Sequence, residues 1–245
     1  MHFLIAEDNP VNAAVLQRLL HRLSHSWETV ENGQLAVDKV RDGGSYDAIL
    51  MDLQMPVLDG LEAAKVILAE ASSPPPIIAC TANTFDTDRR AAAEAGMVEF
   101  LAKPVKLGVL EQALANVAQA SSGPSLEEAD TDDGTIDWEH FEMMMDDGDE
   151  EMLEIFEDFC QSVREWVGQL DQFREAEDWT SFAELAHQLK GSLSTFGVSG
   201  LAGEVGSLER AIKDGQPFEV TAPWASATLQ KFAEVETKLR ENLGK

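Results

Sequence analysis

The sequence predicts an α/β domain with a five-stranded parallel sheet, followed by an all-α domain that forms an antiparallel helical bundle. In the first half of the chain, short apolar runs alternate with segments of helical periodicity, as expected for strands that are each followed by a helix. In the second half the strand pattern disappears, and long amphipathic stretches follow one another. Residues 120–135 are small, polar and acidic, so we expect a flexible linker there, between domains at 1–119 and 136–245.

The predicted strands of the first domain are short apolar runs of the length that a buried strand needs. They cover residues 3–6, 48–51, 77–80 and 98–101, with residues 26–30 as a weaker fifth strand. A helical pattern follows each run, at residues 10–23, 33–42, 58–71, 87–95 and 106–118. Strands joined by helical crossovers pair in parallel and carry helices on both faces, so we expect a sheet that is buried on both sides.

The second domain is predicted from helical periodicity alone. Amphipathic stretches cover residues 149–177, 179–196, 201–213 and 222–242, and a shorter helix is expected at residues 137–145. Each stretch has one apolar face, and such faces bury one another in a bundle.

The charge of the chain argues against two classes of partner. With 45 acidic and 18 basic residues, the net charge is −27, which repels nucleic-acid phosphates and anionic membrane surfaces. No segment approaches the roughly 20 consecutive apolar residues of a membrane span, and the first residues lack the pattern of a signal peptide. Cys80 and Cys160 are far apart among apolar residues, as expected for buried thiols in a reducing compartment. We therefore expect a cytoplasmic protein that binds neither nucleic acid nor membranes directly.

Chemically active residues of the first domain follow the predicted strands. Glu7 and Asp8 follow the first strand, Asp52 follows the third, Thr81 the fourth and Lys103 the fifth. Because the carboxyl ends of parallel strands form the ligand crevice of such a sheet, we expect these side chains to meet. Crowded carboxylates repel one another unless a cation joins them, and Mg²⁺ prefers oxygen ligands. A carboxylate can also accept a phosphoryl group, whose oxygens Lys103 and Thr81 would neutralise.

This pattern resembles the receiver (response regulator) family over residues 2–120. The motifs are Glu7-Asp8, Asp52 within the run 51–60, Thr81-Ala82-Asn83 and the run 100–104 that contains Phe100, Lys103 and Pro104. The resemblance implies a flavodoxin-like fold with Asp52 as the phosphoacceptor.

The same resemblance implies roles for the residues around Asp52. Asp8, Asp52 and the backbone carbonyl of Gln54 would hold Mg²⁺, with Glu7 nearby. Thr81 and Phe100 would form a switch pair that responds to phosphorylation. The family more often has Asp in one or both positions of the acidic pair, and Glu7 is a common departure.

In the second domain, one helical segment combines a buried stripe with a histidine outside it. The stripe recurs at helical spacing and consists of Phe182, Leu185, Ala186, Leu189, Leu193 and Phe196. His187 shares its own face with Glu184, Lys190, Gly191 and Ser194. An imidazole can accept a phosphoryl group, Lys190 would neutralise the added charge, and Gly191 would leave room for a partner.

The run His187-Gln188-Leu189-Lys190-Gly191, followed by Gly197, resembles the histidine phosphotransfer (HPt) family over about residues 136–242. This resemblance implies that His187 carries phosphohistidine, in a reversible two-component phosphorelay with Asp52. Neither a glycine-rich ATP lid nor a Walker loop is present, so we expect no kinase activity. Phosphate would come from an upstream histidine kinase or from a kinase region outside this chain, and a receiver domain would dock at His187.

Several alternatives stay open at this point. A 16-residue flexible linker spans roughly 20–25 Å, so transfer from Asp52 to His187 within one chain and transfer to separate partners are both compatible with the sequence. The direction of transfer is open as well. In a different class of function, phosphorylation of Asp52 would control partner binding by the helical domain, and His187 would be chemically idle. An aspartate-based phosphatase is disfavoured because Gln54 occupies the position of its second aspartate.

Overall fold

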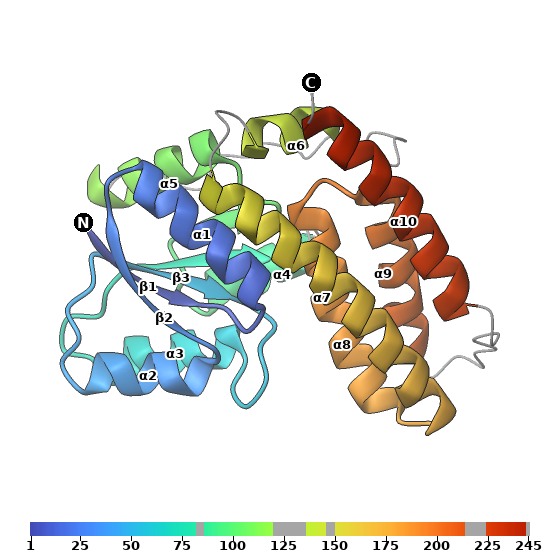
Figure 1. Cartoon of the computed structure of the whole chain (residues 1–245). Coiled ribbons are helices and arrows are strands. Elements are labelled where there is room, and N and C mark those ends of the chain that lie inside the picture. Colours follow the sequence, from blue (N-terminus) through green and yellow to red (C-terminus); the bar gives the residue numbers. More distant parts are fainter. Residues whose placement is uncertain (82–85, 120–135, 146–149, 214–223, 244–245) are drawn as a thin grey trace. The chain divides into compact units, whose positions relative to one another are not determined.

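The computed structural model (Figure 1) describes residues 1–81, 86–119, 136–145, 150–213 and 224–243. The chain forms two compact units, Met1–Asp130 and Thr131–Lys245. The predicted linker, residues 120–135, lies outside the described residues. Within the described ranges, no helix combines the length and the apolar character that crossing a membrane requires.

The first unit is the predicted α/β domain, with five parallel strands in the order β2-β1-β3-β4-β5. The strands are β1 (His2–Ala6), β2 (Ser26–Val30), β3 (Ala48–Asp52), β4 (Ile77–Thr81) and β5 (Glu99–Ala102). The helices are α1 (Pro10–Arg22), α2 (Gly33–Arg41), α3 (Gly60–Glu70), α4 (Asp86–Glu94) and α5 (Leu107–Gln119). In Figure 1, α1 and α5 lie over one face of the sheet, and α2 and α3 lie over the other.

The centre of the sheet explains why the apolar runs predict strands so well. Every residue of β3 and β4 is buried, because each strand pairs with a neighbour on both sides and helices cover both faces. The edge strand β2 is different, since it pairs only with β1 and only Val30 in it is buried. This exposure is the physical reason for the weaker sequence signal of β2.

Local caps fix where the helices of this unit begin. The side chain of Asn9 accepts hydrogen bonds from the backbone N–H groups of Val11 and Asn12, at 3.0 and 3.3 Å. Asp59 caps α3 by accepting from the N–H of Glu62 at 2.9 Å. Such caps satisfy helix N–H groups that have no partner inside the helix. They set the paths of the loops that leave β1 and β3.

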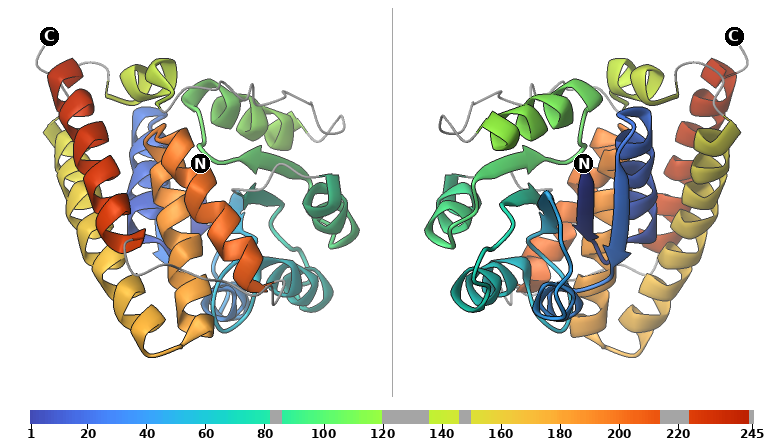
Figure 2. Two further views of the ribbon diagram at one scale, coloured as in Figure 1. Left: turned by 90° about the vertical axis from the view of Figure 1, so that its right-hand side faces the viewer. Right: turned by 90° about the vertical axis from the view of Figure 1, so that its left-hand side faces the viewer.

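The described residues of the second unit form helices, as predicted. Its helices are α6 (Trp138–Met145), α7 (Glu150–Glu175), α8 (Trp179–Thr195), α9 (Ser199–Lys213) and α10 (Trp224–Leu243). Figure 2 shows the four long helices running alongside one another, with α7 packed on α8, α8 on α9 and α10 on α7. All six residues of the predicted stripe on α8 are buried.

Aromatic side chains fill the core of this bundle. Phe159 of α7 stacks on Phe196, just after α8, with ring centroids 4.2 Å apart, and it meets Phe232 of α10 edge-on at 5.7 Å. All three rings are buried. Aromatic burial and offset contacts of this kind hold helices from distant parts of the chain together.

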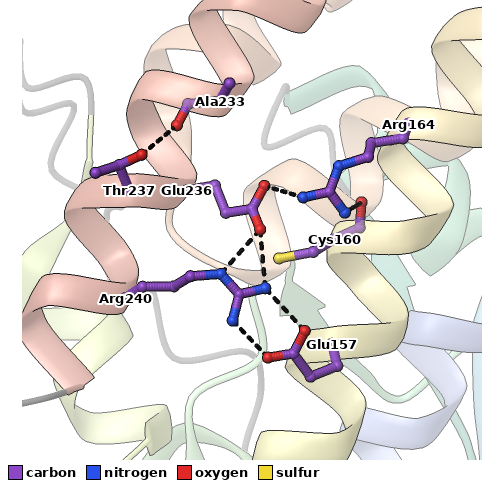
Figure 3. Close-up of polar contacts among 7 residues, drawn as sticks. All are labelled: Glu157, Cys160, Arg164, Ala233, Glu236, Thr237 and Arg240. Carbon is purple, nitrogen blue, oxygen red and sulfur yellow. Dashed lines mark hydrogen bonds and ion pairs between the residues drawn. The ribbon is translucent and has the colours of Figure 1, made fainter.

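A charged network joins α10 to α7 at the border of this core (Figure 3). The guanidinium of Arg240 donates to Glu157 at 2.5 and 2.8 Å and to Glu236 at 2.9 Å. Glu236 also pairs with Arg164, whose guanidinium donates to the carbonyl of Cys160 at 3.1 Å. Because the Glu236 side chain is only 10% exposed, its charge depends on these two arginines.

Candidate functional site

The carboxyl edge of the sheet brings together three charged residues that are far apart in the sequence. Glu7 follows β1, Asp52 ends β3 and Lys103 follows β5. The Lys103 ammonium lies 2.5 Å from Glu7 Oε2 and 2.7 Å from Asp52 Oδ2, and all three side chains are buried. The sequence predicts that these residues meet, and the structure places them in one ion-pair cluster.

Asp8 completes an acidic cluster at this edge. Glu7, Asp8 and Asp52 each offer a carboxylate oxygen, and the three oxygens lie within 4.8 Å of one another. The one positive charge of Lys103 cannot balance three ionised carboxylates. Hard oxygen donors at this spacing fit a small divalent cation such as Mg²⁺.

The burial of the cluster changes its protonation behaviour. Burial raises the pKa of Glu7 to about 8, and the neighbouring Asp52 acts in the same direction while Lys103 opposes it. Burial by itself lowers the pKa of Lys103, but Asp52 and Glu7 outweigh it and the net effect is a raised pKa. Lys103 is therefore a permanent positive charge beside Asp52.

Asn12 belongs to this site, although the sequence analysis missed it. Its amide donates to Glu7 Oε1 at 3.1 Å from the buried face of α1. Asn12 lies between apolar positions of that face, beside Val11 and Ala13. A polar residue within an apolar helical stripe is the signal that identifies it.

The loop after Asp52 is held close to the site by backbone contacts. The N–H of Gln54 donates to Asp52 Oδ1 at 3.2 Å, and the N–H of Gly60 donates to the carbonyl of Leu53 at 3.0 Å. A Cβ atom on Gly60 would lie 2.0 Å from the backbone oxygen of Asp52. Only glycine at position 60 allows the backbone of the loop to approach the Asp52 carbonyl oxygen this closely.

The two residues predicted as a switch pair lie on adjacent strands. Thr81 is buried at the end of β4, and its carbonyl accepts from the N–H of Lys103 at 2.7 Å. Phe100 is half-buried on β5, where the guanidinium of Arg89 from α4 lies 5.1 Å from the ring centroid. Thr81 therefore shares the edge that carries Asp52, whereas Phe100 lies further back along β5.

The second site centres on His187 of α8. Its Nδ1 atom lies 2.9 Å from Glu209 Oε1, and its side chain is 16% exposed. Nε2 has no hydrogen-bond partner among the described residues, and it is not one of their buried unpaired nitrogens. The structure thus gives Nδ1 a protein partner and shows none for Nε2 among the described residues.

Glu209 is the central residue of this second site, and the sequence analysis missed it. Its 7% exposed carboxylate also contacts Lys213 at 2.6 Å and Lys190 at 3.6 Å. Burial favours a raised pKa, but the hydrogen bond from His187 and the nearby positive charges outweigh it and lower the pKa of Glu209 to about 2. Glu209 is thus ionised near neutral pH, so Nδ1 of His187 carries the proton and donates it.

The signal for Glu209 was present in the periodicity of α9. Leu201, Val205 and Glu209 recur every four residues and are all buried. An acidic residue in an apolar stripe needs a partner. Its partners come from α8 and from the end of α9, so only the fold identifies them.

Two glycines bear on the surroundings of His187. Gly191 is buried in α8, and the room that it would leave for a partner stays a prediction. Gly206 of α9 instead faces Lys190, since a Cβ atom there would lie 3.1 Å from Cδ of that lysine. Gly206 thereby leaves room for the stem of Lys190 as it runs toward Glu209.

Comparison with known protein families identifies two matches. Residues 3–115 match the model described as "Response regulator receiver domain", and residues 154–239 match the model of the Hpt domain. The sensory/regulatory protein RpfC of Xanthomonas campestris pv. campestris is 29% identical over 86% of this chain and 30% of its own length. The histidine-protein kinase BarA of Escherichia coli K12 is 26% identical over the whole of this chain and 27% of its own length.

Among solved structures, the receiver domain of sensor histidine kinase PA1611 from Pseudomonas aeruginosa PAO1 is 40% identical to this chain. It covers 48% of this chain and 97% of its own, with a TM-score of 0.45, and was solved with a magnesium ion in its active-site cleft. The present chain spans less than a third of the length of either curated relative.

The fold and the two family models give the chain a receiver domain followed by an Hpt domain. The chain belongs to the response regulator receiver family: besides the model match of its first unit, it is 36% identical to the two-component response regulator 24 of Arabidopsis thaliana over 76% of that protein. Part of its second unit, residues 154–239, matches the Hpt model.

Proposed function

We propose that Asp52 and His187 carry the same phosphoryl group at successive steps of a phosphorelay. The observation that carries this proposal is the environment of the imidazole: Nδ1 pairs with Glu209, and Nε2 has no partner among the described residues. The buried Asp52–Lys103 pair in the same chain supplies the second phosphoryl carrier.

Mg²⁺ is the proposed cofactor at the Asp52 site. Asp8, Asp52 and the backbone carbonyl of Gln54 would hold it, with Glu7 close by. When bound, the ion would shield the negative charge of the phosphoryl oxygens. Lys103 would contact one of these oxygens from its place beside Asp52, and the Thr81 hydroxyl would contact another.

Transfer from Asp52 to His187 requires no proton to leave the imidazole. Nε2 of a neutral ring attacks phosphorus, so the Nε2–P bond forms while the bond between phosphorus and the Asp52 oxygen breaks. Asp52 departs as a carboxylate. The proton stays on Nδ1, where the Glu209 carboxylate stabilises the positive charge that the ring acquires. The ammonium group of Lys190 would neutralise part of the negative charge on the phosphoryl oxygens. The reverse reaction uses the same contacts.

The partners follow from this chemistry. An upstream histidine kinase would supply phosphate, and a receiver aspartate would donate to or accept from His187. Neither matched family model is that of a kinase domain. Phosphorylation of Asp52 would shift Thr81 toward the phosphoryl group and Phe100 toward the interior.

Exchange between two variants of the chain tests the proposal. The donor is Asp52→Ala, phosphorylated on His187 with phosphoramidate and freed of excess reagent. The acceptor is His187→Ala, distinguished by an added tag. With Mg²⁺, we expect the base-stable label of the donor to disappear and a base-labile label to form on the acceptor, because phosphohistidine and acyl phosphate differ in stability to base.

An acceptor that carries both His187→Ala and Asp52→Ala is the matched control and should gain no label. If the donor keeps its label as long with the acceptor as it does alone, the exchange proposal is wrong. The binding switch, with an idle His187, would then be the better account.

A further inference from the structure

Val57 combines two unfavourable features beside the Asp52 site. Its side chain is 82% exposed, the highest exposure among the large exposed hydrophobic residues of the described chain. Its backbone φ is +70°, a left-handed conformation that β-branched residues rarely adopt. Asn or Gly would adopt this conformation more easily, and a polar side chain would suit the exposure. Neither feature stabilises the isolated domain.

The surrounding loop fixes Val57 in this conformation. The N–H of Leu58 donates to the carbonyl of Pro56 at 2.8 Å, which closes a three-residue turn with Val57 at its centre. The carbonyl of Leu58 accepts from the N–H of Gly33 at 3.1 Å. Met55 is buried and Leu58 packs against the core, so the two anchors leave Val57 directed to solvent.

The position of the loop relates Val57 to Asp52. The loop leaves β3 directly after Asp52 and is closed at its base by the contact between Gly60 and Leu53. Asp52 is only 5% exposed, so a macromolecular phosphodonor must approach the carboxyl edge of the sheet closely and cover the loops around it. Residues in strained backbone conformations are found mainly at active sites and at sites that contact a ligand or partner.

We propose that Val57 is a docking residue that packs against apolar side chains beside the phosphohistidine of a protein phosphodonor. This inference rests on the proposed exchange between Asp52 and phosphohistidine. It assigns Val57 to recognition of the donor protein and gives it no part in the chemistry at Asp52.

The test uses the exchange assay with the Val57→Asn substitution in the acceptor. Asn tolerates the left-handed conformation, so the variant should unfold at the same temperature as its parent or a higher one. We expect kcat/KM for transfer from phospho-His187 to fall about tenfold through a higher KM, because the apolar contact is lost. Labelling of Asp52 by phosphoramidate, which needs no protein surface, should be unchanged.

Val98→Asn is the matched control. Val98 is 50% exposed and directly precedes β5, at the opposite edge of the sheet from Asp52, so its variant should transfer at the parental rate. The docking role is overturned if Val57→Asn and Val98→Asn transfer equally fast. It is also overturned if phosphoramidate labelling falls together with transfer, since Val57 would then act on the chemistry. If the parental pair shows no transfer although phosphoramidate labels both residues, the proposed exchange itself has failed.

Discussion

Glu209 illustrates how a single buried residue sets the chemistry of a neighbour. Its carboxylate accepts from His187 Nδ1 and contacts two lysines, so its charge is stabilised although it lies inside the bundle. The ring is thereby oriented and its proton is assigned to Nδ1. A residue in this role resembles the carboxylate that orients histidine in other nucleophilic sites.

The lowered pKa of Glu209 predicts how stability depends on pH. The pKa is about 2 in the folded chain, against an ordinary value of 4.5. A group whose pKa falls on folding contributes stability above its unfolded pKa, and this contribution is lost as the pH falls through the folded pKa. We expect a contribution on the order of 2 kcal/mol near neutral pH, after allowing for solvent screening, that disappears between about pH 4.5 and pH 2.

Urea denaturation of the full chain and of Glu209→Gln, from pH 7 down to pH 2, measures this contribution. The difference in unfolding free energy should shrink across the stated range, because Gln does not titrate. Glu204→Gln is the control, since Glu204 lies on the same helix with an exposed side chain paired to Lys231. An equal pH dependence for both variants would contradict the assignment.

At the scale of secondary structure elements, the junction of β3 and α3 depends on Gly60. A methyl group at this position would meet the backbone oxygen of Asp52 at 2.0 Å, and backbone atoms cannot move aside as a flexible side chain can. We expect Gly60→Ala to destabilise the receiver unit by on the order of 2 kcal/mol or more and to slow labelling of Asp52 by phosphoramidate.

Thermal unfolding and phosphoramidate labelling measure the two effects of Gly60→Ala. Gly108→Ala in α5 is the matched control, because apart from the adjacent residues and the backbone of its own helix nothing lies within 4 Å of the added methyl group. Its stability should be unchanged or slightly higher, since alanine favours helix over glycine. A Gly60→Ala chain as stable and as readily labelled as the control would show that the loop tolerates displacement.

The attachment of α10 to α7 depends on Arg240, which contacts Glu157 and Glu236 and lies 5.4 Å from the centroid of the Phe156 ring. Replacing it with methionine keeps most of the apolar stem but leaves the buried Glu236 with only Arg164. We expect Arg240→Met to lower the unfolding free energy by roughly 1–3 kcal/mol.

Denaturation of Arg240→Met should be compared with that of Lys231→Met. Lys231 forms an exposed pair with Glu204, and such pairs contribute at most about 1 kcal/mol. If the two variants lose the same stability, the network in Figure 3 contributes no more to the attachment of α10 than an exposed ion pair does.

At the scale of the whole molecule, the sequence predicts the features that depend on local pattern. The strands β3 and β4 are fully buried, so their apolar runs are unambiguous, and the motifs at the strand ends predict the meeting of Asp52 with Lys103. The pairing of His187 with Glu209 depends instead on how α8 crosses α9, which no local pattern encodes. The room that Gly206 leaves for Lys190 is set in the same way, by the packing of α9 on α8.

Gly206 shows how the packing of two helices constrains sequence change. Because the stem of Lys190 occupies the space that a side chain at position 206 would need, a larger residue there would push the ammonium group away from Glu209. A side chain at position 206 therefore requires the stem of Lys190 to shift by at least a few tenths of an ångström. Substitution at a position with no functional group of its own can thus remove a charge from the imidazole's surroundings.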